Sequence, residues 1–469
     1  MKKKLVLMTL ALSLFTVGLT SCGEKKEANT EGKVTVSIGE WPSENRPNDQ
    51  ERWNEYKKEV ETKYPDINIV PDEWEYDVQT FLPKASSGQL PTLYPCHLTE
   101  TKKIVKGGYS ADITDNIKDR GWLEYFNKKL LNLCEKDGRY YGLPLGVYKQ
   151  GLACNVELFR QAGLLDENGV PKVPQTWEEL GETAGIIKEK TGQAGFVLPT
   201  INNCGGWHFM NIAWSYGTEF MKQNDDGTWT ATFDSPECTA ALQFVKDLKW
   251  KYNALPDNAL IDQPEMQKLF AVDQGAMYIA SGPDLYLTQT YNMPFDRWSF
   301  TKMPAGPKGR FALMGGKTYM FAPEATYEQI DACLKWLEVS NGFKPAVSEE
   351  DQTAYLEKVK KNAQANLDDG CYIVYSGVSE GTWDIPGLQE KEREIVNSMA
   401  NIDLKLVETA YNQEDVTIQA EEPMNCQDLY SILDACIQEV LTKEDADPAA
   451  LLKKANADFQ TNFLDKIEA

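Results

Sequence analysis

Histidine serves proteins as an acid, a base and a metal ligand, and this chain holds two, His97 and His208. A zinc site with three histidines is therefore impossible, and neither residue begins an HExxH motif. Gly316-Lys317-Thr318 does not complete a phosphate-binding loop, because Phe311 stands where that motif needs glycine. We predict no catalytic residue, metal or cofactor. Since two carboxylates in a cleft suffice for a glycosidase, the 71 acidic residues leave a surface glycoside hydrolase as an alternative.

Aromatic side chains offer a different chemistry, and the chain has 12 tryptophans. A pyranose has apolar C–H faces, which flat rings cover, and hydroxyls, which carboxylates and amides bind in pairs. Trp207 lies in a predicted polar, glycine-rich loop after Gly205 and Gly206, which leave it room to project, so we predict that it is the principal stacking residue. Trp41 follows a predicted strand, where α/β proteins bind ligands. For both tryptophans the alternative is a place in the core.

These residues need a scaffold of strands and helices. Alternating apolar residues predict strands at 34–38 and 67–70. Between them Asn48 and Glu51 have the spacing of a capping box. An apolar helical face that includes Trp53 and Val60 follows and is expected to face the core, until Pro65 ends the helix. Strand, helix and strand in this order form the unit of an α/β domain. Further helices are predicted after caps at Thr176, Ser235 and Thr326, and along an apolar stripe at 429–440.

The N-terminal residues predict export. Three lysines at 2–4 precede an uncharged apolar run at 5–20, which is too short for a membrane span and typical of a signal peptide, residues 1–21. Leu19-Thr20-Ser21-Cys22 is similar to a bacterial lipobox, which implies lipidation of Cys22; an ordinary signal peptide with a chance cysteine is the alternative. Residues 22–32 carry no large apolar side chain and predict a flexible tether.

Charge and cysteine content narrow the class of protein. The formal net charge of −23 repels nucleic acid, so no nucleic-acid partner is expected. Ten cysteines include no CxxC pair, and with Cys22 lipidated an odd number remains. That count indicates neither a disulfide scaffold nor a zinc ribbon, and most of the cysteines are expected in the core.

Several stretches, in order, resemble the family 1 extracellular solute-binding proteins, the sugar-binding components of ABC importers. The longest runs from Asp137 to Pro144 and continues to Cys154–Phe159. The others are Tyr64–Ile67, Phe81–Lys84 with Ser87–Pro91, Gly107–Ile113, Thr176–Leu180, Phe270–Ile279 and Gly315-Gly316. The resemblance covers nearly the whole chain after the tether, and it is weakest from about 343 to 423.

The resemblance implies an α/β protein with the two-lobe fold of the type II periplasmic binding proteins and a ligand cleft between the lobes. Residues 33–145 and 308–342 would form the N-terminal lobe, and residues 146–307 and 343–469 the C-terminal lobe. Crossings between the lobes are expected near 143–150, near 303–311 and after the helix at 326–340.

The resemblance also implies a function. The protein would be the lipid-anchored binding component of an ABC importer, a monomer on the outer face of the cytoplasmic membrane. It would capture a carbohydrate, with an oligosaccharide expected, and deliver it to permease subunits. A binding protein for a peptide or another non-sugar solute remains a further alternative.

The family pattern adds ligand-binding candidates. His97 lies in a loop that often touches ligand in this family, and Tyr148 lies in the first crossing. Asp284 stands where the family often has an aromatic residue, which would replace stacking by a hydrogen bond. Trp383, in the poorly matching region, would supply an aromatic wall. His208, Gly315 and Gly316 complete the set; the glycines would let a ligand approach the backbone or would form an ordinary turn.

Overall fold

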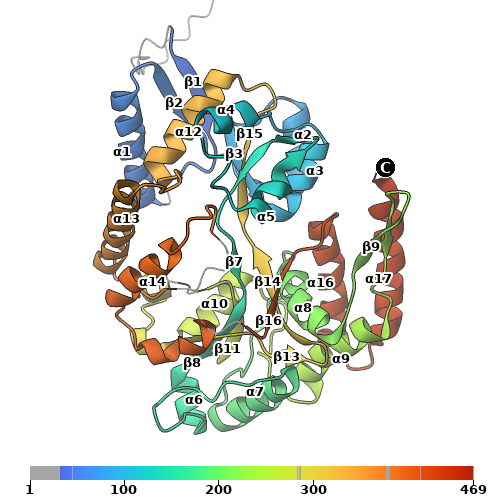
Figure 1. Ribbon diagram of the computed structural model, residues 1–469. Coiled ribbons are helices and arrows are strands. Elements are labelled where there is room, and N and C mark those ends of the chain that lie inside the picture. The colour runs from blue at the N-terminus through green and yellow to red at the C-terminus, as the bar shows by residue number, and fades with distance from the viewer. Residues whose placement is uncertain are drawn as a thin grey trace, which may run out of the picture.

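The computed structural model describes residues 32–44, 46–282, 284, 287–375, 381–411 and 414–467. The predicted signal peptide, the lipobox with Cys22 and nearly all of the tether lie outside these residues. Figure 1 shows two lobes, with β1 and α1 in the upper one and α7 and α9 in the lower one.

The N-terminal lobe is built on a five-stranded sheet in the order β2-β1-β3-β15-β6. Its strands are β1 Val34–Ile38, β2 Ile67–Pro71, β3 Leu93–His97, β6 Gly142–Pro144 and β15 Lys317–Phe321. β1 pairs in parallel with β2 and β3, and β15 runs antiparallel between β3 and β6. The helices are α1 Pro47–Lys63, α2 Val78–Ser86, α3 Thr101–Lys106, α4 Thr114–Asp119, α5 Lys128–Leu131 and α12 Tyr327–Asn341. The predicted strand–helix–strand unit is confirmed.

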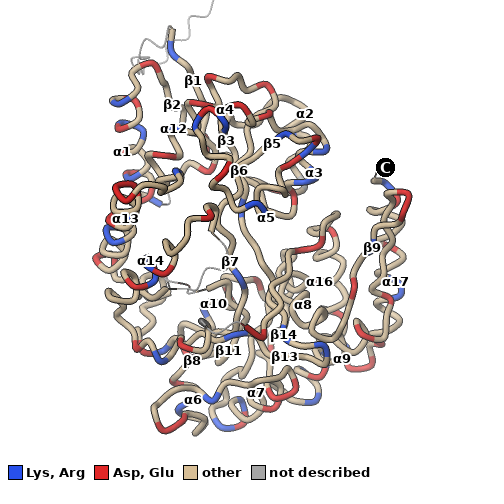
Figure 2. The backbone as a smooth tube through the Cα atoms, viewed as in Figure 1, with Lys and Arg blue, Asp and Glu red and all other residues tan. Residues whose placement is uncertain are grey.

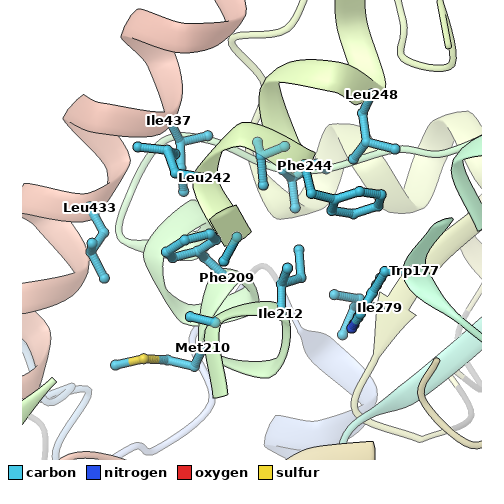
Figure 3. Packing of buried hydrophobic residues seen from close by; sticks show 14 of the residues in the cluster. Trp177, Phe209, Met210, Ile212, Leu242, Phe244, Leu248, Ile279, Leu433 and Ile437 are labelled. Atoms are coloured by element: carbon cyan, nitrogen blue, oxygen red, sulfur yellow. The ribbon is translucent and has the colours of Figure 1, made fainter. Parts of the chain in front are cut away.

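The C-terminal lobe is built on a three-stranded sheet in the order β11-β8-β12, with β8 Gly151–Asn155 between β11 Met277–Ala280 and β12 Trp298–Thr301. Its helices are α6 Val156–Ala162, α7 Trp177–Thr191, α8 Cys204–Tyr216, α9 Pro236–Trp250, α10 Gln263–Ala271, α11 Leu287–Tyr291, α15 Glu408–Tyr411, α16 Cys426–Thr442 and α17 Pro448–Asn462. Figure 3 shows Phe209, Met210 and Ile212 of α8 packed among side chains of α9 and α16. The helix α8 therefore lies at the centre of this lobe.

Two crossing segments form an antiparallel ribbon between the lobes. β14 Gly309–Gly315 belongs to a sheet of the C-terminal lobe with β13 Ala305–Gly306 and β16 Val416–Ala420, and only Gly316 separates it from β15 in the other lobe. The second segment runs from β6 through β7 Tyr148–Lys149 to β8, and β7 pairs with β14. The first crossing lies where it was predicted, and the second lies at 314–317, a few residues after the predicted one.

The predicted lobe boundaries need two corrections. β14 was placed in the N-terminal lobe, but it pairs with β16 and buries Ala312 and Leu313 in the core of the C-terminal lobe. Residues from 343 on do not belong to one lobe, because Phe343 packs in the core of the N-terminal lobe and Tyr372 in that of the C-terminal lobe. α13 Glu349–Asp368 and α14 Leu388–Ser398 follow in this segment, beside the gap between the lobes in Figure 1.

Local signals placed most helix ends correctly. Thr176, Ser235 and Thr326 each accept a hydrogen bond from the backbone of the helix that they cap, and Thr326 forms a complete capping box with Gln329. The predicted cap at Asn48 is wrong, because α1 begins at Pro47, whose ring fixes the backbone angle of a first helical residue.

Two small hairpins, β4 Glu135–Lys136 with β5 Arg139–Tyr140 and β9 Met221–Gln223 with β10 Trp229–Ala231, complete the strands.

Nine cysteines in the described part of the chain are free thiols, and eight of them are buried, as expected of small core residues. Figure 2 shows basic and acidic residues distributed over both lobes. None of the helices in the described ranges is both long and apolar enough to cross a membrane.

Candidate ligand-binding site

A cavity of about 220 Å³ lies where the two lobes and the ribbon meet, and we call it the central cavity. His97 at the end of β3 lines it from the N-terminal lobe, and Tyr148 and Gly316 line it from the ribbon. The C-terminal lobe supplies Asn202, Asn203, Cys204, Trp207, Gln263, Glu421, Gln427 and Tyr430. Aromatic rings, amides and one carboxylate thus face the same space.

Trp207 reaches this cavity from the first turn of α8, where a loop had been predicted. The prediction failed because Gly205 and Gly206 serve helix packing here: a Cβ on Gly206 would lie 2.5 Å from the backbone of Tyr430 in α16. The glycines therefore let α8 and α16 touch, which a larger residue would prevent. The half-buried ring of Trp207 stacks on His208, with ring centroids 4.9 Å apart.

The start of α8 is held by a carboxylate from α16. Asp434 Oδ2 accepts a hydrogen bond of 2.8 Å from the backbone N–H of Asn203, and Oδ1 accepts one of 2.6 Å from that of Gly206. These are among the N–H groups that a helix leaves without an internal partner. Asp434 is buried, and burial raises its pKa to about 6. It thereby fixes the turn that carries Trp207.

Glu421 is the carboxylate of the central cavity. The Tyr430 hydroxyl donates a hydrogen bond of 2.8 Å to Glu421 Oε1. Burial raises the pKa of Glu421 to about 7, while hydrogen bonds from Tyr430 and Trp207 act in the opposite direction. Near neutral pH this side chain therefore exists in both protonation states, and it can donate to a ligand hydroxyl or accept from one.

His97 faces Glu421 from the other lobe. Burial, and next the nearby Lys317 ammonium, lower the pKa of His97, while Glu40 raises it. Its ring contacts the ring of Tyr76 edge-on, with centroids 5.3 Å apart. A neutral imidazole has one donor and one acceptor nitrogen, so His97 suits a hydroxyl group of a ligand.

The two glycines of the ribbon have different roles. A Cβ on Gly315 would lie 2.5 Å from the Tyr148 hydroxyl oxygen, so this glycine makes room for the tyrosine ring. Gly315 does not line the central cavity, whereas Gly316 does. The predicted close approach of a ligand therefore remains a proposal for Gly316, and for Gly315 it is corrected to a packing role.

Trp41 and His208 lie in the core, and both predictions are corrected. Trp41 is 4% exposed and packs between Trp53 and Trp336, with ring centroids 5.2 and 5.3 Å away. His208 is 1% exposed, and burial lowers its pKa to about 3. On α8 it faces the core beneath Trp207, so it supports the stacking residue without reaching the cavity.

Asp284 and Trp383 also lie away from the central cavity. Asp284 accepts a hydrogen bond from the Tyr278 hydroxyl, and burial raises the pKa of its carboxyl group. Trp383 packs against Phe126 and Phe343 of the N-terminal lobe, with centroids 4.3 and 5.0 Å away. Neither side chain lines the central cavity, so contact with a ligand stays a prediction for both.

Two kinds of feature would indicate catalysis, a nucleophile elbow and a metal-ligand cluster. Gly377 to Gly381 have the spacing of a serine-hydrolase nucleophile elbow, but the described residues on either side form no strand before it and no helix directly after it. Within the described residues, no three His, Cys, Asp or Glu side chains are arranged to hold a metal ion.

Sequence reasoning missed most of the lining from the C-terminal lobe. Asn202 and Asn203 have positive φ angles of 60° and 67°, and the pair before two glycines was an available signal for a turn. Glu421, Gln427 and Tyr430 had no such signal. Gln427 and Tyr430 reach the cavity through the packing of α16 on α8, and Glu421 through the pairing of β16, which it directly follows, with β14.

A sequence profile of the bacterial extracellular solute-binding proteins matches residues 46–338. The chain belongs to this family. A binding-protein homologue of Brucella abortus (strain 2308) is 25% identical over 289 residues, which cover 61% of this chain and 66% of the relative, just under two thirds of its length. The arabinooligosaccharide-binding protein of Halalkalibacterium halodurans is 23% identical over 290 residues, which cover 59% and 60% of the two chains.

The solved structure of another solute-binding protein confirms the predicted two-lobe fold class. The ABC transporter solute-binding protein of Thermotoga lettingae TMO, bound with alpha-D-tagatose, superposes with a TM-score of 0.68 over 92% of this chain and 99% of the other. The two sequences are 19% identical, so the likeness is one of fold. This extracellular solute-binding protein therefore has the two-lobe architecture with its central cavity between the lobes.

Proposed function

We propose that this protein is the lipid-anchored binding component of an ABC importer and captures a carbohydrate, an oligosaccharide, in the central cavity. One observation carries the proposal: residues of both lobes and of the connecting ribbon converge on a cavity that combines Trp207 and Tyr148 with amide side chains and Glu421. Two-lobe proteins of this architecture close on ligands by hinge motion.

The chemistry of the lining supports a sugar. Rings of Trp207 and Tyr148 offer flat apolar surface, and Asn202, Gln263 and other amides offer paired donors and acceptors. Glu421 is the single carboxylate among the described lining residues, whereas glycoside hydrolysis requires two. The lining therefore favours binding over hydrolysis.

The relatives support the same class of ligand. One is named for binding arabinooligosaccharides, and the Thermotoga protein was solved with a ketohexose. Both names describe those proteins. Their sequences are 23% and 19% identical to this chain, so the relatives indicate a class of ligand and not a particular sugar.

Calorimetry against a panel of monosaccharides and oligosaccharides, with product analysis of the same mixtures, tests the proposal. Heat of binding without products is the expected result. New reducing ends in the mixtures would identify a glycoside hydrolase instead. No binding to any sugar of the panel would favour a peptide or another solute, and would overturn the proposal.

Trp207→Ala should weaken carbohydrate binding about thirtyfold, or about 2 kcal/mol, because a central stacking ring is lost. Thermal stability should fall by less than the roughly 3–5 kcal/mol expected for a fully buried tryptophan, since Trp207 is half-buried. Calorimetry and thermal melts measure the two effects. Trp250→Ala, at an exposed site at the end of α9, should leave affinity unchanged. If Trp207→Ala melts at a lower temperature but binds with wild-type affinity, Trp207 belongs to the core and does not stack on the ligand.

Cells that express the protein should incorporate radioactive palmitate into it, and Cys22→Ala should abolish the label. The reason is that the Cys22 thiol is the acceptor in the proposed lipobox. Immunoprecipitation followed by autoradiography measures the label. Cys204→Ala, which removes a partly exposed thiol of the folded part, should retain it. Equal label in wild type and Cys22→Ala would disprove the anchor.

A further inference from the structure

A second cavity of about 500 Å³ adjoins the central cavity on the N-terminal lobe. His97 lines both cavities, and Lys317 of the second cavity directly follows Gly316 of the first. The two spaces therefore meet at one point of the ribbon and of β3. A ligand longer than one ring in the central cavity would extend past His97 into the second cavity.

Trp53 of α1 lines this second cavity with a ring that is held in place. The sequence pattern indicated only that Trp53 faces the core, but its side chain is half-buried. Its ring centroid lies 5.2 Å from that of Trp41 at an angle of 82°, and 5.6 Å from that of Trp336. A ring fixed from one side and open on the other is preorganised for stacking, because it loses little freedom when a ligand binds.

The charges of the second cavity indicate what kind of ring it would accept. Three acidic and three basic side chains line it: Glu40, Asp49, Glu75, Arg46, Arg52 and Lys317. Lys317 donates to both oxygens of Glu40 at 2.7 and 3.0 Å, and Arg52 pairs with Asp49. The balance of charge favours a neutral polyhydroxylated unit over an anionic one, since such groups bind hydroxyls as donors and acceptors alike.

We propose that the second cavity is a subsite for a further neutral sugar unit, and that Trp53 sets the preferred ligand length. One unit occupies the central cavity against Trp207, and the next passes His97 and stacks on Trp53. This inference rests on the proposed carbohydrate function and specifies that the ligand is a neutral oligosaccharide.

The test compares the affinity for a monosaccharide with that for the oligosaccharides built from it. Calorimetry is done with arabinose, maltose-type and chitin-type ladders of one to six units, and the ladder that binds is used for the variants. Trp53→Ala should lower affinity for oligosaccharides at least tenfold and change monosaccharide affinity less than twofold. Trp207→Ala should lower both. Trp250→Ala serves as the control, as it removes a ring outside both cavities.

Trp53 also packs on Trp41 and Trp336, so Trp53→Ala could lose affinity because the protein is destabilised. A second variant separates this effect from the loss of stacking. Trp53→Phe retains an aromatic ring in that cluster and should reduce oligosaccharide affinity about threefold, with monosaccharide affinity unchanged. Thermal melts establish that each variant is folded.

The outcomes separate this inference from the function on which it rests. If no neutral sugar binds the wild-type protein, both the proposed function and the subsite fail. If sugars bind with an affinity that is independent of length, and both Trp53 variants match wild type, the subsite alone is overturned. Stronger binding of uronic acid oligomers than of neutral ones would also overturn it.

Discussion

Asp434→Ala should lower the free energy of unfolding by about 3 kcal/mol and weaken ligand binding as well. The substitution leaves the backbone N–H groups of Asn203 and Gly206 without their acceptor, and each buried donor left unpaired costs about 1–3 kcal/mol. Binding should suffer because Asn203 and Trp207 of the same turn line the central cavity. Urea unfolding and calorimetry measure the two effects.

Asp447→Ala is the matched control for this prediction. Asp447 also accepts from two backbone N–H groups at a helix start, Ala449 at 2.9 Å and Ala450 at 3.4 Å, but at an exposed site of α17. Loss of an exposed cap should cost about 1 kcal/mol and leave affinity unchanged. If Asp434→Ala unfolds and binds as the control does, Asp434 does not organise the site.

Glu422→Gln should make the free energy of unfolding depend less on pH between pH 5 and pH 8. Burial raises the pKa of Glu422 to about 7 from a usual 4.5, against a hydrogen bond of 3.2 Å from the Trp214 indole N–H. Between these two values the folded state binds more protons than the unfolded state, so the stability that Glu422 contributes is lost as pH rises. A shift of this size corresponds to roughly 3 kcal/mol, and glutamine removes the titration while it keeps an acceptor for Trp214.

Urea unfolding of both proteins across this pH range gives the difference directly. The stability of Glu422→Gln relative to wild type should increase from pH 5 to about pH 7.5 and then level off. Other carboxyl groups contribute equally to both proteins, among them Glu157, whose pKa is lowered to about 2 by hydrogen bonds. A difference that stays constant with pH would show that Glu422 is not protonated in the folded state at neutral pH.

The local parts of the fold were predictable because their signals lie within a few residues of each other. The caps at Thr176, Ser235 and Thr326 act on N–H groups three residues away, and each was found where it was predicted. The family could be identified from short stretches in order, which together define the two-lobe architecture. Signals of this kind do not depend on what the element later packs against.

The site was predicted less well, and Trp41 and Trp53 show why. A strand end suggested that Trp41 faces ligand, and a helical apolar face suggested that Trp53 faces the core. In the structure α12 brings Trp336 against both rings, so Trp41 is enclosed and Trp53 keeps one side on the second cavity. Which of two adjacent rings is covered depends on a third, which is distant in sequence.

The sequence by itself determined the class of fold, the strand–helix order, most helix caps and four cavity residues: His97, Tyr148, Trp207 and Gly316. Only the tertiary structure decided that Glu421 is the carboxylate of the cavity and that Gly206 serves the contact of α8 with α16. The physical reason is that caps and periodicity act through neighbouring residues, whereas the burial and pKa of a cavity side chain depend on the elements packed around it.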